Sequence, residues 1–327
     1  MNLHRTRRWV IASALAAACA LPSAASAQNW PNRPIRMIVP YTPGGYTDFM
    51  ARTVGQKLSE ALGQPIIFEN RPGANSVIGA DAVAKAAPDG YTFGTVIAAH
   101  AVNATLNPKL PYDVLKDFSY VSVMSVAPLM MAGRKDLPAS SVQEVIALAK
   151  SKPGELNFAS SGIGAAAHLT MEYFKSRTGT NMTHVPYKGT APALTDLLGG
   201  RVDVMFDTVG AFMAQVTAGN VKAIAVTAKD RMPAAPNVPT VHESGVPDFM
   251  SGTWAALIAP AGLPKEIMER MSAEVQKALR DPGLRERLAK EGYEAIGNTP
   301  DECAQFVRDE VTKWAKVIKD AGIKAEE

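Results

Sequence analysis

The feature that most constrains the fold of this chain is a regular alternation of strand-like and helix-like segments. IRMIVPY (35–41), PIIFEN (65–70) and TFGTVIAA (92–99) read as strands, and the helical spacings between them cover about residues 47–62 and 76–86. A β-α-β-α-β order implies parallel strands joined by crossover helices. The sequence therefore predicts an α/β protein whose sheets are mixed, mostly parallel and flanked by helices.

A second series of alternating segments begins near Leu129 with the strand-like LMMAG (129–133), after a loop over residues 107–117 and a strand over 120–126. Ser141 and Glu144 form a capping box, which predicts a helix start. Four further strands are expected at residues 156–160, 183–187, 203–207 and 221–227, with helices between them at about 164–178, 190–199 and 210–219.

The last part of the chain returns to the first series. A proline-rich stretch at residues 232–241 is interpreted as a traverse, followed by a strand at 253–260 and a helix from Pro264. Thr299 and Glu302 predict the capped start of a long final helix. We therefore expect two lobes, one from residues 28–128 plus 252–327 and the other from 129–251. Two crossing segments would form a hinge, as in clamshell (type II) binding proteins.

The N-terminal residues have the pattern of a signal peptide. Arg5, Arg7 and Arg8 form a positive region, residues 9–21 are a short apolar run, and Ala25-Ser26-Ala27 is a small-residue cleavage pattern. We expect residues 1–27 to be removed on export. This removal takes away three arginines and no acidic residue, which lowers Lys+Arg from 34 to 31, equal to the number of Asp+Glu.

A neutral mature chain disfavours nucleic acid and anionic membrane surfaces as partners, since both require a basic excess. A bound anion must then be held by local groups. Cys303 is the only cysteine after residue 27, so no intrachain disulfide is possible, and its helical position favours a small buried residue.

The stretch YTPGGYTD (41–48) lies between the first strand and its helix. Two glycines allow the backbone to approach a guest closely, and a helix N-terminus presents unpaired N–H groups that suit an anion. A tight turn that binds nothing is the alternative. Asp48 is interpreted as a cap that orients this loop, with Arg52 four residues on, or else as a receptor for a ligand amine.

Two later turns repeat this arrangement. VPY precedes a glycine-containing turn at residues 185–192, as it does at 39–45, and SSGIGAAAHL (160–169) opens a helix after a strand. Ligands of open α/β sheets bind beyond the carboxyl ends of strands, where these turns lie. The spacing Gly162-x-Gly164-x-x-Ala167 also satisfies the dinucleotide pattern, but no acidic residue follows some twenty positions on.

Hydrolytic chemistry has weaker support. The sequence has no G-x-S-x-G motif, and the histidines at 100, 168, 184 and 242 have no metal-ligand spacing. A triad of Ser161, His168 and Asp207 is not excluded, because triads assemble in space. A hydrogen-bonded structural role is the simpler interpretation of His168. A periplasmic hydrolase or lyase using Ser160/Ser161 and His168 is the rival hypothesis.

Six long motifs then point to one family. They are IRMIVPYTPGGYTDFMAR, ENRPGANSVIGADAVAKAAPDGYT, KLPYDVLKDFSYVS, LNFASSGIGAAAHLTMEYFK, VPYKGTAPALTDLLGGRVDVMFD and APAGLPKEI. From about Pro31 to the C-terminus the chain resembles the Bug family, the periplasmic solute-binding proteins of tripartite tricarboxylate transporters. This resemblance implies a non-enzymatic, cofactor-free periplasmic protein, expected as a monomer. Its two lobes would close on a small organic carboxylate and present it to membrane permease subunits, although a sensor would use the same pocket.

The resemblance also implies which residues bind the ligand. They are Tyr41, Thr42, Pro43, Gly44, Gly45, Tyr46, Thr47 and Asp48 in the first turn, Ala98 and His100 in the stretch Ile97–His100 after the third strand, Ser160, Ser161, Gly162, Gly164, Ala165 and Ala166 in the second lobe, Tyr187, Lys188, Gly189 and Thr190 in the VPY turn, and Asp207. Tyr46 stands where the family often has a small residue. We hypothesise that its ring biases the site toward aromatic carboxylates, with Trp254 and Phe212 as further walls.

Overall fold

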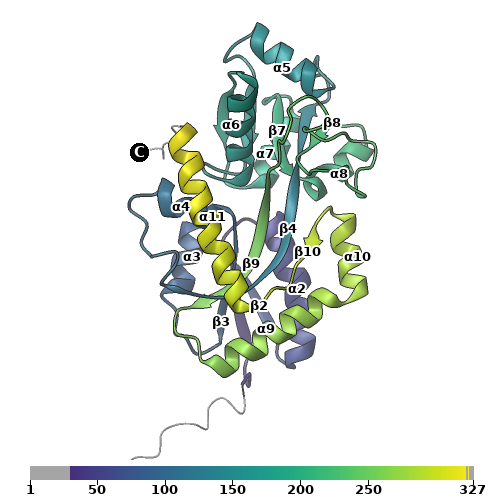
Figure 1. The fold of residues 1–327 in the computed structure, drawn as a ribbon. Helices are drawn as coiled ribbons and strands as arrows, with labels where there is room; N and C mark the ends of the chain where they lie inside the picture. The colour runs from purple at the N-terminus through teal and green to yellow at the C-terminus, as the bar shows by residue number, and fades with distance from the viewer. Residues whose placement is uncertain (1–29, 322, 324–327) are drawn as a thin grey trace, which may run out of the picture.

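The computed structural model describes residues 30–321 and 323, so the predicted signal peptide at residues 1–27 lies outside the described part of the chain. Within that part the fold is the expected one, with two α/β lobes stacked one above the other and joined by long strands (Figure 1). None of the described helices is long and apolar enough to cross a membrane.

The first lobe contains a mixed sheet covered by helices on both faces. Its strands are β2 (Ile66–Asn70), β1 (Ile35–Val39), β3 (Thr92–Ile97), β9 (Gly252–Pro260) and the first half of β4 (Phe118–Arg134), with β10 (Glu294–Ala295) paired to β4. β2, β1 and β3 are parallel to one another, and β9 is antiparallel to both β3 and β4. The parallel pairing of these three strands was predicted and is confirmed, but β9, β4 and β10 pair antiparallel, so the sheet is mixed rather than mostly parallel.

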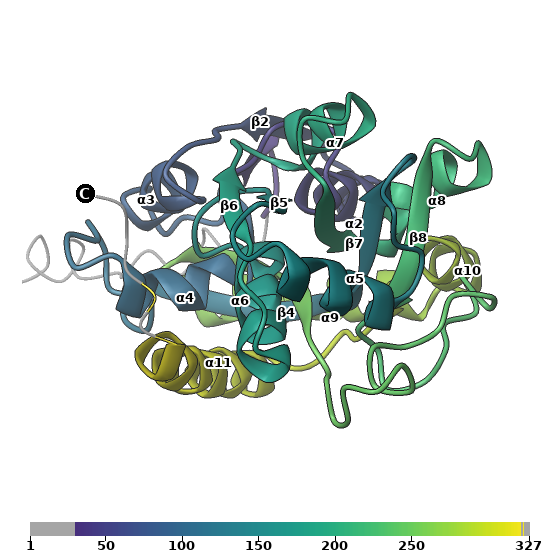
Figure 2. The ribbon, with the colours of Figure 1, turned by 90° about the horizontal axis from the view of Figure 1, so that it is seen from above.

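Helices α2 (Tyr46–Leu62), α9 (Lys265–Arg280) and α10 (Pro282–Lys290) pack against one face of this sheet. The other face is covered by α3 (Val77–Ala84), α4 (Ala99–Leu106) and α11 (Pro300–Ala321). Seen from above, α11 runs along one side of the molecule, with α2 and β2 on the opposite side (Figure 2). The predicted capping box of α11 is present, since Glu302 N donates to Thr299 Oγ1 and Thr299 N donates to Glu302 Oε2.

The second lobe repeats the same layering. The second half of β4 pairs antiparallel with β7 (Val204–Thr208) and β8 (Val221–Val226). On its other edge, β7 pairs parallel with β5 (Asn157–Ser160), which in turn pairs parallel with β6 (Thr183–Pro186). Helices α5 (Val142–Ser151) and α6 (Ala166–Thr178) pack on one face. Helices α7 (Thr190–Leu198) and α8 (Val209–Thr217) pack on the other.

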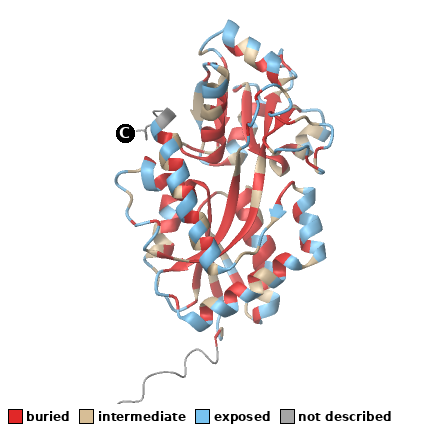
Figure 3. Ribbon diagram, in the orientation of Figure 1, coloured by how far each residue is buried: buried red, intermediate tan, exposed pale blue. Residues whose placement is uncertain are grey.

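One long strand links the lobes where two separate strands were predicted. β4 is continuous from Phe118 to Arg134, and it is buried along nearly its whole length, as is β9 (Figure 3). Pro128 lies within this strand, although proline cannot donate a hydrogen bond to a strand ladder. It is tolerated because it pairs with Gly252 at the end of the β9 ladder, and β7 takes over as partner from Leu129.

Three elements were missed by sequence patterns. α4 begins at Ala99, where the apolar run was interpreted as the end of a strand, because short apolar runs do not distinguish strand from helix. β10 has only two residues. α10 does carry a local signal, since Asp281 caps it by accepting from Leu284 N and Pro282 follows at the first helical position.

Candidate functional site

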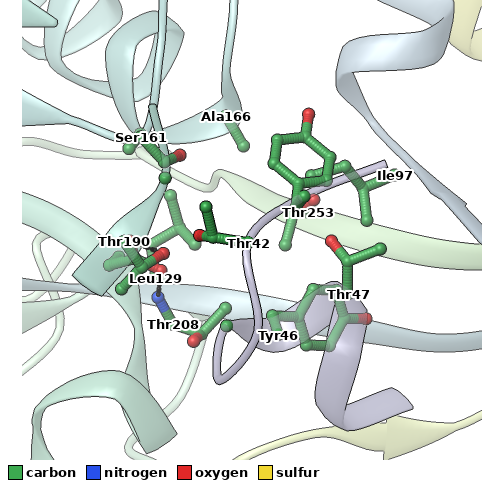
Figure 4. Close-up of a pocket in the computed structure, with 15 residues that line it drawn as sticks. Thr42, Tyr46, Thr47, Ile97, Leu129, Ser161, Ala166, Thr190, Thr208 and Thr253 are labelled. Atoms are coloured by element: carbon green, nitrogen blue, oxygen red, sulfur yellow. Dashed lines mark hydrogen bonds between the residues drawn. The ribbon is translucent and has the colours of Figure 1, made fainter. Parts of the chain in front are cut away.

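A cavity of about 40 Å³ lies between the two lobes, where the carboxyl ends of several strands meet (Figure 4). Both lobes contribute to its walls. The lining residues are Tyr41, Thr42, Gly45, Tyr46, Thr47, Ile97, Leu129, Ser161, Ala166, Ala167, Gly189, Thr190, Asp207, Thr208 and Thr253. In Figure 4, Ser161, Thr190 and Thr208 approach it from one side, and Thr47 and Ile97 from the other.

Four helices begin at this cavity. α2 starts at Tyr46, α6 at Ala166, α7 at Thr190 and α8 at Val209, and the N-cap residue of each makes no side-chain hydrogen bond to the first turn. Elsewhere, α5 and α10 are capped by Ser141 and Asp281, whereas α3, α4 and α9 also start without a side-chain cap. The unpaired N–H groups of four first turns therefore converge on one small space, which favours an anion.

The loop before α2 is shaped by Asp48 from behind. Gly44 has φ +87°, and its N–H donates to Asp48 Oδ2 at 3.1 Å. Arg52 Nε and Asn70 Nδ2 donate to the same carboxylate at 2.9 and 3.0 Å. Burial opposes the charge of Asp48, but these hydrogen bonds outweigh it and lower its pKa. Asp48 thus orients the loop, as predicted, and it does not line the cavity.

The turn before α6 is held by two stacked histidines. Ser160 is fully buried, and its Oγ lies 2.6 Å from His184 Nε2. His168 Nδ1 accepts from Gly164 N at 3.0 Å, and the His168 and His184 rings stack with centroids 4.0 Å apart. Burial lowers the pKa of His168 to about 3 and that of His184 to about 4, so both rings are neutral at pH 7.

These contacts contradict the triad of Ser161, His168 and Asp207. His168 bonds to Gly164, and Asp207 bonds to Thr190 and Thr208, while Ser161 makes no hydrogen bond to a histidine in the described chain. The histidines brace the turn from behind, as the structural interpretation of His168 proposed. No described group of three or more His, Cys, Asp or Glu is placed to hold a metal ion.

Asp207 is the one carboxylate in the cavity wall. It is 7% exposed and accepts from Thr190 Oγ1 at 2.8 Å and from its neighbour Thr208 N at 2.7 Å. Burial raises its pKa to about 6, even though these hydrogen bonds favour the charged form. Asp207 therefore positions the start of α7, and its charge is weakly held compared with that of Asp48.

Several lining residues were not among those predicted. They are Leu129, Ala167, Thr208 and Thr253, whereas Ile97 belongs to the stretch after the third strand that the resemblance implied. Thr208 ends the parallel strand β7, so the rule on strand carboxyl ends would have found it. Thr253 is the second residue of the antiparallel strand β9, and no local pattern marks it. Its hydroxyl is buried and has no hydrogen-bond partner among the described residues, which leaves it free for a ligand.

Some predicted residues lie behind the wall rather than in it. Pro43, Gly44, Ala98, Gly164 and Ala165 do not line the cavity. His100 is fully buried among Tyr112, Phe118 and Tyr120, with its Nε2 3.0 Å from the Tyr120 hydroxyl. It faces away because α4 has already begun at Ala99 and turns the side chain into the core. Gly162, Tyr187 and Lys188 line a separate, neighbouring cavity.

The expected aromatic walls are also corrected. Phe212 is fully buried in the core of the second lobe, packed with Met130 and Val226. Trp254 is buried against Phe306 and donates from Nε1 to Glu310, which fastens α11 to β9. Neither ring reaches the cavity, because each fills the apolar core of its own lobe.

Tyr46 does line the cavity, but its ring is already engaged. The Tyr46 hydroxyl lies 2.7 Å from Ser125 Oγ, and the ring packs edge to face on Tyr293 with centroids 4.8 Å apart. It belongs to the supporting structure of the first lobe as much as to the cavity wall.

A two-lobed α/β fold with a polar cavity between its lobes defines a periplasmic binding protein. The chain matches the tripartite tricarboxylate transporter family receptor over residues 50–323. It belongs to this family of periplasmic solute-binding receptors, which bind rather than convert their ligands, as predicted.

Individual relatives agree along the whole chain. The protein BugT of Bordetella pertussis is 38% identical over 324 residues, covering 98% of this chain and 99% of that protein. A solved structure of R. palustris Rpa4515 with adipate is 37% identical, with a TM-score of 0.88, covering 90% of this chain and 99% of the other. MatC of Rhodopseudomonas palustris with bound malate is 34% identical, with a TM-score of 0.83, covering 88% of this chain and 100% of the other.

Proposed function

We propose that this receptor captures a small organic carboxylate in the cavity between its lobes and delivers it to the permease subunits of a tripartite tricarboxylate transporter. The observation that carries the proposal is the convergence of four helix N-termini without side-chain caps on one cavity. Two relatives have structures with adipate and with malate, both of which are carboxylates.

The cavity can hold a carboxylate without a fixed cation. No Lys or Arg is among its lining residues, whereas the hydroxyls of Thr42, Thr47, Ser161, Thr208 and Thr253 are. Each charge-assisted hydrogen bond from an amide or hydroxyl contributes on the order of 1.5–3 kcal/mol. A few such bonds are enough to hold one carboxylate between the lobes.

We further propose that residues 28–128 with 252–327, and residues 129–251, move as two bodies of a monomer. The lobes already touch across the cleft, since Asn75 Nδ2 donates to Ile163 O at 2.6 Å and the Thr208 and Tyr293 hydroxyls lie 3.3 Å apart. A ligand that contacts both bodies favours this closed arrangement, because only differential contacts can shift the equilibrium.

Aliphatic acids are favoured over aromatic ones within this proposal. The aromatic hypothesis rested on Tyr46, which borders the cavity but has its ring already packed on Tyr293, and the two further walls suggested for it, Trp254 and Phe212, do not border the cavity. A flat aromatic acid therefore cannot stack on a free Tyr46 ring, which leaves Tyr41 as the other tyrosine of the cavity wall.

Calorimetric titration of residues 28–327 tests the function. We expect binding of aliphatic dicarboxylates, weaker binding of benzoate-type acids, and no binding of the matching amides. The variant Thr253→Val should weaken carboxylate binding several-fold without lowering the stability of the free protein, because it removes a buried hydroxyl that has no partner.

The control is Thr95→Val on the neighbouring strand β3, whose fully buried hydroxyl contacts only Met37 Sδ. This variant should leave affinity unchanged. Amides that bind as well as acids, or equal losses in both variants, would refute the proposal.

A further inference from the structure

The two lobes pack closely against each other at a place outside the ligand cavity. The first turn of α8, in the second lobe, lies against residues 291–293 of the first lobe, in the segment that joins α10 to β10 (Figure 1). The cavity that we assign to the carboxylate is lined by other residues. This contact therefore joins the lobes through atoms that a bound acid does not meet.

Two glycines allow this close approach. A Cβ at Gly210 would lie 2.7 Å from the Tyr293 hydroxyl and 3.2 Å from Glu291 O, and it would also meet the Glu291 carboxylate. A Cβ at Gly292 would lie 2.9 Å from Val209 Cβ. Each lobe thus presents a residue without a side chain where atoms of the other lobe stand. Packing of this density does not accept an additional methyl group without a shift.

Tyr293 connects this contact to the ligand cavity. Its buried ring packs edge to face on Tyr46 of the first lobe, with centroids 4.8 Å apart, and its hydroxyl lies 3.3 Å from the Thr208 hydroxyl of the second lobe. Tyr46 and Thr208 both line the cavity, from opposite lobes. The surroundings of the Tyr293 hydroxyl therefore depend on how the two lobes are arranged around a ligand.

Gly210 can be substituted without straining its own backbone. It is the second residue of α8, its φ is not positive, and alanine has a higher helix propensity than glycine. The three atoms nearest to a Cβ at this position, outside its own helix, all belong to Glu291 and Tyr293 of the first lobe. A methyl group there would collide with the other lobe in this arrangement, and separation of the lobes would relieve the collision.

We propose that the contact between Gly210 and residues 291–293 sets the affinity of the receptor for its ligand from outside the ligand cavity. Gly210 and Tyr293 are positioning residues, because they determine how closely the lobes can approach. The apparent affinity of a protein falls with the population of its binding-competent state. A bulkier residue at this contact disfavours the closed lobes and weakens binding. This inference rests on the proposed function and specifies how its affinity is controlled.

Calorimetric titration of residues 28–327 with the tightest-binding aliphatic dicarboxylate of four to eight carbons tests this inference. We expect Gly210→Ala to weaken binding at least about fivefold, the lower end of the usual effect of one overpacked group. The melting temperature of the free variant should not fall, because alanine favours α8 and separated lobes avoid the collision.

Tyr293→Phe distinguishes a collision between the lobes from damage within α8. This variant keeps the ring on Tyr46 but removes the hydroxyl that a methyl group at position 210 would meet. We expect Tyr293→Phe alone to weaken binding modestly, because it loses the contact with Thr208. Adding Gly210→Ala to it should weaken binding at most about twofold further, which makes the double-mutant cycle non-additive.

The matched control is Gly283→Ala. Gly283 is also the second residue of a nine-residue helix, α10, but it is exposed, and a Cβ there would approach only Asp281 Oδ1, at 3.4 Å, among the described residues. This variant should leave the affinity unchanged.

Four results would overturn the inference and leave the proposed function standing. They are an unchanged affinity of Gly210→Ala, equal losses from Gly210→Ala with and without Tyr293→Phe, an equal loss in Gly283→Ala, and a lower melting temperature of free Gly210→Ala, which would place the collision within its own lobe. If wild-type protein binds no dicarboxylate of the series, the proposed function itself fails and this inference fails with it.

Discussion

At the residue scale, two aspartates beside the same cavity have opposite electrostatic settings. Asp48 is held by Arg52, Asn70 and the Gly44 amide, and its pKa is lowered. Asp207 is buried without a cation, and its pKa is raised to about 6. Asp48 keeps its negative charge and uses it to hold the loop before α2. Asp207 can accept a proton near neutral pH, which matters where an anionic ligand is to be bound.

Asp207 therefore predicts a specific pH dependence of stability. Its pKa rises from 3.8 to about 6 on folding, so the folded state binds this proton more tightly and the stability that it contributes is lost as pH rises from about 4 to 6. At about 1.36 kcal/mol per pKa unit, the loss is on the order of 3 kcal/mol at pH 7. Asp207→Asn should remove this slope.

The measurement is chemical denaturation of wild type and Asp207→Asn at pH 4 and pH 7. His168 and His184 also titrate in the acid range, but they contribute equally to both proteins, so the difference between the proteins isolates Asp207. Parallel pH profiles for the two proteins would contradict the assignment.

At the scale of single elements, α2 has a left-handed glycine near each end. Gly44, just before the N-cap, has φ +87°, and Gly63, the C-cap, has φ +67°, and neither has an atom within 4 Å of the place where a Cβ would stand. Only Gly44 belongs to the loop at the cavity. The pair separates the effect of backbone strain from an effect on binding.

We expect Gly44→Ala and Gly63→Ala each to lower the free energy of unfolding by about 1 kcal/mol, because alanine is disfavoured at positive φ. Only Gly44→Ala should also weaken carboxylate binding, by reshaping the turn that presents the α2 amides. Thermal denaturation and calorimetry on both variants distinguish these effects. Equal weakening by Gly63→Ala would show that α2 stability, rather than loop geometry, controls affinity.

The same scale shows what sequence patterns can reveal. Strand and helix alternation, the Ser141 and Thr299 caps and the glycine turns are local features, so they were predictable from neighbouring residues. The continuity of β4 through Pro128 depends on Gly252, far along the chain, and local patterns do not contain it. Thr253 reaches the cavity for the same reason, through sheet pairing between distant segments. The orientations of Trp254 and Phe212 depend on which core each ring fills.

At the scale of the whole molecule, the lobes meet through few polar contacts. Asn75 is the clearest, since it is held within the first lobe by Tyr41 and bonds to Ile163 O of the second. One net hydrogen bond contributes about 0.5–1.5 kcal/mol, enough to shift an open–closed equilibrium several-fold.

We expect Asn75→Ala to open the unliganded protein, seen as a larger radius of gyration in small-angle X-ray scattering. Saturating carboxylate should restore the wild-type value. Tyr41→Phe is the control, because it removes the bond to Asn75 Oδ1 but keeps the bond between the lobes. A wild-type radius in free Asn75→Ala would show that this contact does not hold the lobes together.

Pro128 and Gly252 are paired at the end of the β4–β9 ladder. A Cβ at Gly252 would lie 2.8 Å from Ala127 O, so no side chain fits there without prying the strands apart. Pro128 thus lacks an amide hydrogen and Gly252 lacks a side chain, and the two residues lie at the same level of the molecule. We expect bending at this level to break the fewest backbone hydrogen bonds. The absence of a side chain at Gly252 would then determine how the two lobes are arranged in the free receptor.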